Sequence, residues 1–170
     1  MTFTLGGSRS IPNGNIIDDV AVTVKRVAEF SNGLAFYEAD QRTGAIVADG
    51  KTLAPGDPGY LQGALANARA AGLVLDASRL PAFGKQGTFD LPINDTKSYG
   101  LLLLVKNDPG TLFSSFAAAN PGGAMQVISL GSPGGGVTFG VEDTLVTGGA
   151  SDRDYNDLIV TLGHAAPDPG

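Results

Sequence analysis

Residues 142–157 constrain the fold of this chain more than any other segment, because they carry six carboxylate or carboxamide side chains within sixteen residues. The six are Glu142, Asp143, Asp152, Asp154, Asn156 and Asp157. Carboxylates held this close raise one another's pKa and repel in a folded chain unless a cation lies between them. Arg153 alone cannot neutralise the five carboxylates. Calcium can, since it accepts about six to eight oxygen ligands at roughly 2.3–2.6 Å in loose geometry. The segment therefore predicts a calcium site.

Three of these side chains stand at every second position. In this respect Asp152, Asp154 and Asn156 match the first half of the helix-loop-helix calcium motif. The second half of that motif is missing, because its glycine and its bidentate glutamate would fall at Asp157 and Gly163. The remaining ligands must therefore come from elsewhere in the chain.

Glu142 and Asp143, at the upstream end of the segment, are the expected source of those ligands. Residues 158–162 are apolar and β-branched, which is typical of a strand buried on both faces or nearly so. We therefore expect the acidic segment to connect two strands, residues 137–141 and 158–162. The alternative is a solvated hairpin loop with a turn at Gly148-Gly149, but solvation does not explain the alternating positions.

The composition suits one domain made of many short strands. The chain has 170 residues, with 25 glycines, 10 prolines and 42% hydrophobic residues. Such a mixture favours short strands joined by tight turns over disorder. We expect a single calcium-binding and ligand-binding domain over residues 1–163. Residues 164–170 end in Pro-Asp-Pro-Gly and are predicted to be a linker.

Hydrophobic patterns predict eight or more strands and one helix. The predicted strands are residues 20–25, 34–39, 45–48, 73–75, 88–93, 100–105, 111–117, 125–128, 137–141 and 158–162. The short loop at 40–44 suggests that the strands on either side of it form a hairpin. Asp57-Pro58 predicts the N-cap and first residue of a helix that continues to Gly72. These elements favour a mainly β fold, a jelly-roll-like β-sandwich with one short helix packed on one edge.

The net charge and the cysteine count narrow the class of protein. A charge of −6 argues against nucleic acid and anionic membranes as partners, and no run of about eighteen apolar residues predicts membrane insertion. The chain has no cysteine, so outside the cell its rigidity would need another source such as calcium, whereas a cytosolic protein needs no disulfides. Residues 1–10 lack the apolar core of a signal peptide, and we expect a module of a longer chain.

The chain is not expected to be an enzyme. His164 is its one histidine, so neither a serine triad nor a two-histidine metal site can form. Ser132 stands one position away from the serine of a nucleophile elbow, and residues 44–52 miss the spacing of a phosphate-binding loop. The acids are concentrated in one loop, without the second isolated carboxyl that glycoside hydrolysis needs.

Several motifs resemble those of a bacterial domain family of unknown function found in calcium-rich surface proteins. They are FSSFAAANP at 113–121, FGVED at 139–143, DRDYND at 152–157 and PGDPGY at 55–60. Within that family the chain is most similar to the calcium-dependent peptide-binding domain near the C-terminus of giant RTX adhesins. Such proteins leave the cell unfolded by type I secretion and fold outside it in calcium. The glycine-rich nonapeptide repeats of those proteins are absent, which implies a distal module.

The resemblance implies an extracellular module at the bacterial cell surface that acts in adhesion and biofilm formation, with Ca2+ as its cofactor. Its implied partner is a peptide or protein on another cell, with a free C-terminus as one candidate. We expect the ligand pocket near Asn107, Asp108 and Asn120, although Asp108 and Asn120 each precede Pro-Gly and are more typical of turns. The module is expected to be a monomer within a longer multidomain adhesin.

Two other functions stay open at this point. A carbohydrate-binding module could use calcium to hold glycan hydroxyls, although sugar platforms favour tryptophan and the chain has none. A calcium-stiffened structural spacer in a long fibre would bind no ligand.

Overall fold

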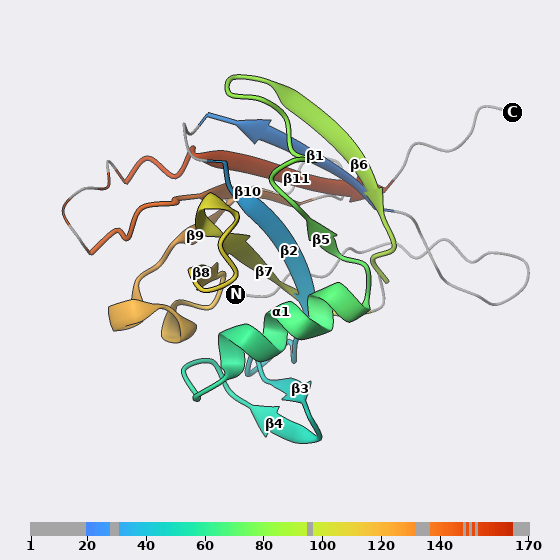
Figure 1. Cartoon of the computed structure of the whole chain (residues 1–170), viewed down its shortest axis with the longest axis vertical. Coiled ribbons are helices and arrows are strands. Elements are labelled where there is room, and N and C mark those ends of the chain that lie inside the picture. The colour runs from blue at the N-terminus through green and yellow to red at the C-terminus, as the bar shows by residue number, and fades with distance from the viewer. Residues whose placement is uncertain are drawn as a thin grey trace, which may run out of the picture.

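Two antiparallel sheets pack face to face, and a helix covers the outer face of the smaller sheet (Figure 1). The computed structural model describes residues 20–27, 31–94, 97–131, 137–147, 149, 151 and 153–164. Within these residues the predicted class, a mainly β sandwich with one α-helix, is confirmed.

The larger sheet has five strands and the smaller sheet four. In spatial order the larger sheet contains β6 (Gln86–Leu91), β1 (Val20–Arg26), β11 (Leu158–His164), β10 (Val137–Val141) and β9 (Val127–Gly131). The smaller sheet contains β5 (Val74–Leu75), β2 (Gly33–Glu38), β7 (Tyr99–Leu104) and β8 (Leu112–Ser114). A separate ribbon pairs β3 (Ile46–Ala48) with β4 (Lys51–Leu53). The helix α1 spans Tyr60–Ala70, and 3-10 turns lie at Val105–Asn107, Ala117–Ala119 and Pro121–Gly123.

The ends of the chain lie largely outside this description. Of the predicted linker, residues 164–170, only His164 is described, and it is the last residue of β11. Among the described helices, none has the length and apolar character needed to cross a membrane.

The first hydrophobic core fills the space between the two sheets. In β1, Val20, Val22 and Val24 are fully buried and alternate with more exposed residues. Leu101 and Leu103 of β7 contribute to the same core from the other sheet. Burying each such side chain stabilises the fold by roughly 1.5–3 kcal/mol relative to leaving it exposed. The alternation therefore fixes which face of β1 turns inward.

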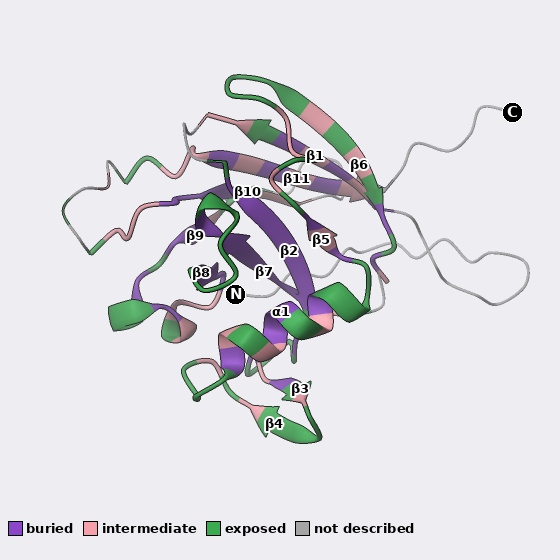
Figure 2. Cartoon of the chain, in the orientation of Figure 1, coloured by how far each residue is buried: buried purple, intermediate pink, exposed green. Residues whose placement is uncertain are grey.

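A second core lies between the smaller sheet and α1. Ala35 and Tyr37 of β2 and Leu102 of β7 belong to it, so β2 and β7 are buried on both faces (Figure 2). Ala64 and Leu65 are among the residues that α1 buries against them. The helix lies across the face of the sheet and not on an edge as predicted, because β2 and β7 have no polar face to leave in water.

The start of α1 also differs from the prediction. Gly59, with a φ of 84°, precedes the first helical residue, and no side chain caps the helix. Asp57 Oδ2 instead accepts a hydrogen bond from Ala54 N at 2.8 Å. Asp57 therefore closes the turn before the helix, and glycine supplies the left-handed conformation that the cap position needs.

The predicted hairpin between the segments seen here as β2 and β3 is wrong. β2 pairs with β5 and β7, so other strands occupy both of its edges. Asp40 Oδ1 accepts hydrogen bonds from Arg42 N and Thr43 N, both at 2.8 Å, and this turn carries the chain out of the sheet. β3 then pairs with β4 across Asp49-Gly50, where φ is 50° and 72°. Two positive φ values are typical of a two-residue hairpin turn.

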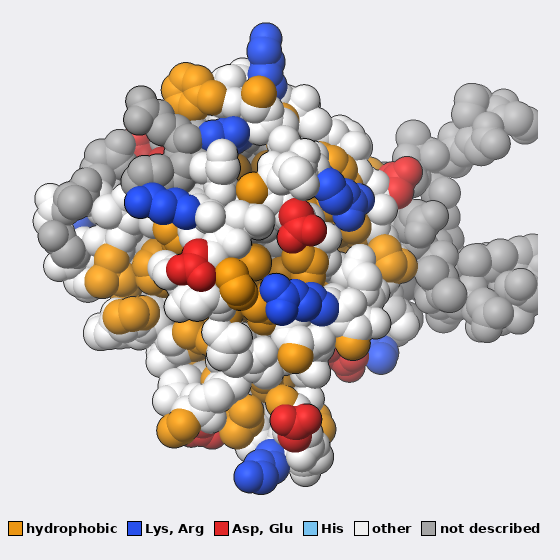
Figure 3. Space-filling model, viewed as in Figure 1, with side chains coloured by type: hydrophobic (Ala, Val, Ile, Leu, Met, Phe, Trp, Pro, Cys, Tyr) orange, Lys and Arg blue, Asp and Glu red, His pale blue; other side chains and the backbone are white. Residues whose placement is uncertain are grey.

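Surface charge does not single out a binding site on the face shown in Figure 3. There, basic and acidic side chains stand singly among polar and apolar ones. Buried charges are therefore the more informative guide to function, since a charge that has left water needs a specific partner.

Candidate metal site

The acidic segment connects β10 to β11 at one end of the larger sheet. These strands pair antiparallel, as predicted, and the pair nearest the segment is Val141 with Leu158. Glu142 and Asp143 directly follow one strand and Asp157 directly precedes the other, so the pairing brings their side chains together. One carboxylate oxygen of each lies within 4.8 Å of the others. These three residues form an acidic group that could hold a metal ion.

Two members of the acidic group are almost completely buried. Glu142 is 2% exposed and Asp143 is 5% exposed, while Asp157 is partly buried. No lysine or arginine in the described part of the chain forms an ion pair with any of the three. A buried charge without a partner costs on the order of several kcal/mol. The arrangement therefore suits a bound cation.

Neutral donors orient these carboxylates. Asn32 Nδ2 donates to Asp143 Oδ2, and Asp143 N donates to Asp157 Oδ2, both at 2.8 Å. Tyr155 N donates to Glu142 Oε2 at 3.3 Å. Glu142 Oε1 receives no hydrogen bond from the described residues, so one oxygen of a buried carboxylate is left for another partner. The hydrogen bonds position the acids without neutralising them.

The pKa of Asp157 reflects the same shortage of positive charge. It is raised from 3.8 to about 7, chiefly by burial and also by the nearby carboxylates of Asp143 and Glu142. The hydrogen bond from Asp143 N acts in the opposite direction. The metal-free acidic group therefore holds a proton near neutral pH, and a bound cation would displace it.

Gln126, just before β9, holds the backbone that carries the first two acids. Its side chain is fully buried, and its Nε2 donates to Glu142 O at 3.0 Å and to Thr144 O at 2.9 Å. Its Oε1 accepts a hydrogen bond from Val146 N at 2.9 Å. Neither Gln126 nor Asn32 was among the predicted site residues, because both lie outside the acidic segment and no local pattern indicates such distant contacts.

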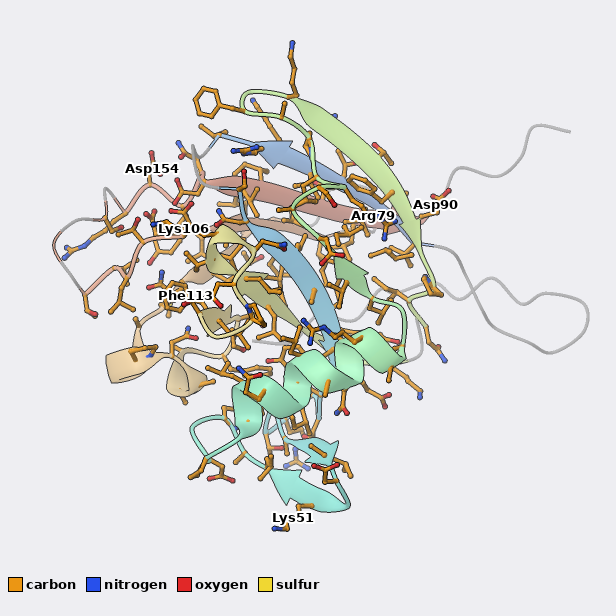
Figure 4. All side chains as sticks on the ribbon, in the orientation of Figure 1. Lys51, Arg79, Asp90, Lys106, Phe113 and Asp154 are labelled. Atoms are coloured by element: carbon orange, nitrogen blue, oxygen red, sulfur yellow. The ribbon has the colours of Figure 1, made fainter. Side chains whose placement is uncertain are left out.

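The structure does not bring every predicted ligand into the acidic group. Asp154 is exposed, and its Oδ1 accepts a hydrogen bond from Asn156 N at 3.2 Å (Figure 4). Asn156 is partly buried, and Asp152 lies outside the described residues. Positive φ values of 58° at Arg153 and 54° at Tyr155 give this stretch an irregular path. Of the alternately spaced residues, Asp154 therefore lies outside the acidic group.

The donor atoms of the acidic group indicate the class of ion that fits. All of its side-chain donors are carboxylate oxygens, which hard cations such as calcium and magnesium prefer. Two adjacent acids from one strand end and one from the other bring three donor oxygens within 4.8 Å of one another. The residues present therefore fit a hard divalent cation.

The three residues predicted to bind a ligand all hydrogen bond to the backbone, Asp108 and Asn120 to nearby residues and Asn107 to Ala77 N, 30 residues away in sequence. Asn107 Oδ1 accepts a bond from a backbone N–H at 3.1 Å, and Asp108 Oδ1 accepts one at 2.9 Å. Asn120 Oδ1 accepts a bond from Ser114 N at 2.7 Å, and its Nδ2 donates to Ser114 O at 2.8 Å. These contacts agree with the turn-forming role considered for Asp108 and Asn120.

An open groove of about 590 Å³ lies beside the acidic group. It is lined by Val105, Lys106, Asp108, Thr111, Phe113, Asp143, Thr144 and Leu145. A second hollow of about 440 Å³ shares Thr111 and Phe113 with the groove and reaches Asn120. Figure 4 places Lys106 and Phe113 in this part of the molecule. The groove thus joins apolar side chains to a carboxylate of the acidic group, Asp143.

Comparison with known proteins finds a family model that matches part of the chain. Residues 85–165, which are 81 of the 170 residues, match the model of a family described as a domain of unknown function (DUF4114). The match runs from the start of β6 to the end of β11 and includes the acidic group and the groove. No curated protein and no solved structure matches the chain. The match supports the predicted resemblance to a domain family of unknown function.

Proposed function

We propose that this chain is a non-catalytic, calcium-dependent adhesion module of a secreted bacterial adhesin of the RTX type. It acts outside the cell, as a monomer within a longer multidomain protein, and captures peptides or proteins on other cells. The observation that carries this proposal is the buried acidic group, which no lysine or arginine of the described residues neutralises. The resemblance of the acidic motifs to those of calcium-dependent adhesin domains supplies the biological setting.

Calcium suits the acidic group better than magnesium does. Magnesium requires nearly ideal octahedral geometry and keeps several waters, whereas calcium accepts irregular sets of carboxylates and backbone carbonyls. Glu142, Asp143 and Asp157 come from two strand ends and an irregular loop, which is a set of this irregular kind. Asp152, Asp154 and Asn156 stay proposed as further ligands on the basis of their spacing in the sequence.

The groove favours a peptide or protein as the ligand. Val105, Phe113 and Leu145 give it apolar walls suited to peptide side chains, and Asp143 joins it to the acidic group. An ion held by Asp143 would add positive charge to the wall of the groove, where a carboxylate of the ligand could be recognised. A chain end is therefore a natural candidate for the captured group.

Binding arrays with and without calcium test the proposal. The domain is applied to a peptide array and to a glycan array in calcium, and again in EDTA, while thermal melting is followed under both conditions. We expect calcium to raise the melting temperature and to be required for capture on the peptide array. Capture on the glycan array alone would favour a carbohydrate-binding module, and calcium stabilisation without capture on either array would favour a structural spacer. Melting that calcium leaves unchanged would contradict the proposal as a whole.

A further inference from the structure

Two buried carboxamides from different parts of the fold converge on the acidic group. Asn32 lies just before β2 of the smaller sheet and is 2% exposed. Gln126 lies just before β9 of the larger sheet and is 0% exposed. Burying a carboxamide is unfavourable unless its donors and acceptor are hydrogen bonded, so the partners of these amides show what they stabilise.

Gln126 is bonded to the backbone around the acids. Its side chain makes three hydrogen bonds to Glu142 O, Thr144 O and Val146 N, between 2.9 and 3.0 Å. Its own carbonyl accepts a fourth from Glu142 N at 2.9 Å. The regular pairing of β10 ends at Val141, so Gln126 replaces the ladder for the residues that follow. It thereby fixes where the side chains of the acidic group emerge.

Asn32 is bonded to a carboxylate of the acidic group itself. Its Nδ2 donates to Asp143 Oδ2 at 2.8 Å, while its Oδ1 accepts a bond from Lys106 N at 2.9 Å. The bond from Lys106 N holds the amide of Asn32 in place. The amide in turn sets the direction of the Asp143 carboxylate. A lysine or arginine in the same place would neutralise Asp143 and compete with a metal ion, whereas an amide orients the charge and leaves it available.

From this geometry we infer that Asn32 and Gln126 are positioning residues of the metal site, which hold its ligands in their binding arrangement before the ion arrives. The inference rests on the proposed calcium-binding function. It implies that the metal-free site is already ordered, so that binding costs little conformational entropy. Residues that support metal ligands in this way typically contribute about 10–100-fold to metal affinity.

Asn120 provides a matched control. It is a third buried carboxamide, 5% exposed, and it too bonds backbone groups at 2.7–2.8 Å, namely Ser114 N, Ser114 O and Ala124 O. None of these partners belongs to the acidic group. Loss of a structural amide and loss of a positioning amide can therefore be told apart within one protein.

The experiment compares Asn32→Leu, Gln126→Met and Asn120→Leu, each of which replaces a carboxamide by an apolar side chain of similar size. All three should melt at lower temperature in EDTA, because backbone groups lose partners. Calcium affinity, measured by calorimetry below the melting transition, should fall about tenfold or more for the first two and stay within about twofold for Asn120→Leu. Equal affinities in all three variants would overturn the inference.

A measurement on the unmodified protein covers the case in which a variant does not fold. Hydrogen exchange is recorded residue by residue in EDTA. The backbone N–H of Val146 donates to Gln126 Oε1, and that of Lys106 donates to Asn32 Oδ1. We expect both amide hydrogens to be protected from exchange in the absence of metal. Exchange of both at unprotected rates until calcium is added would contradict the inference. Failure of the unmodified protein to bind calcium would instead contradict the proposed function. Protection in EDTA is measured without calcium, so it tests the order of the site independently of that failure.

Discussion

Among the described residues, the tyrosine cluster under α1 and the acidic group are both buried and polar, but they differ in charge. In the cluster under α1, the hydroxyl of Tyr37 lies 2.6 Å from Ser114 Oγ and 3.1 Å from the hydroxyl of Tyr60. Tyr60 in turn donates to Gly44 O at 2.7 Å. The acidic group at the end of β10 contains three carboxylates without a cation from the described residues.

The ionisation of the two clusters explains the difference. Burial raises the pKa of Tyr37 to about 12 and also raises the pKa of Tyr60, so these hydroxyls stay neutral. A neutral hydroxyl needs only hydrogen-bond partners, and the fold supplies them. Burial also raises the pKa of Asp157, but only to about 7, and the group keeps negative charge at neutral pH. A neutral polar cluster can thus be completed within the chain, whereas a charged one calls for a partner from outside.

The largest expected effect comes from deleting charge in the acidic group. Glu142→Gln and Asp157→Asn each remove a carboxylate ligand, so calcium affinity should fall at least about 100-fold, the upper end of the loss seen for merely supporting residues. Neither variant should be less stable in EDTA, since each relieves repulsion. Calorimetry and thermal melting measure the two quantities. The control is Asp40→Asn, which removes the same charge at an exposed turn. An equal loss of calcium affinity in this control would mean that the loss reflects the net charge of the protein and not a missing ligand.

A change in the tyrosine cluster should affect stability alone. Tyr37→Phe leaves the hydroxyls of Ser114 and Tyr60 without a shared partner, so the free energy of unfolding should fall by about 1–3 kcal/mol. The loss should be the same in calcium and in EDTA, as urea unfolding can show. A difference of more than about 0.5 kcal/mol between the two conditions would mean that the clusters are coupled.

Stability and calcium binding should depend on pH through the acidic group. The pKa of Asp157 is 3.8 in the unfolded chain and about 7 in the folded, metal-free chain. Between these two pH values the folded chain therefore holds a proton that the unfolded chain has already released. The stability from this group is therefore present below pH 3.8 and lost as the pH rises through about 7, while calcium binding strengthens over the same range. Denaturant unfolding in EDTA and calcium titration at several pH values test this. Asp157→Asn should remove both trends, and their persistence would assign them to another group.

The smallest effect is expected at Asp154. Because this carboxylate is exposed and outside the acidic group, Asp154→Ala should weaken calcium binding by less than about tenfold. Calcium titration of this variant beside Asp157→Asn gives the comparison. A loss as large as that of Asp157→Asn would make Asp154 a full ligand, as its spacing in the sequence suggests.

The parts of the site that the sequence predicts are those with local signals. An apolar, β-branched run directly after the acids indicates β11, and the strand before them is β10 as predicted. Once these strands pair, Glu142, Asp143 and Asp157 must meet, because they flank the same end of the ladder. The spacing of Asp154 and Asn156 was less informative, since Tyr155 between them has a positive φ of 54° and the regular alternation of a strand is lost.

The remaining features depend on contacts between distant segments. β2 could have paired with its neighbour in sequence, but it pairs with β5 and β7, and in this place the larger sheet covers one of its faces and α1 covers the other. Asn32 meets Asp143 across 111 residues, and Tyr37 meets Ser114 across 77. Buried amides and hydroxyls of this kind have no periodic pattern, because their partners are single atoms and not a face of the sheet.

The position of β11 has a mechanical consequence. β11 lies between β1 and β10, with seven residue pairs to the first and five to the second. Tension along this strand from His164 loads both ladders in shear, so many hydrogen bonds must break together. The acidic group lies beyond the opposite end of β11, beside Leu158, where an ion would resist the sliding of β11 past β10. A calcium ion at this place would therefore raise the force that the domain withstands, in addition to its equilibrium stability.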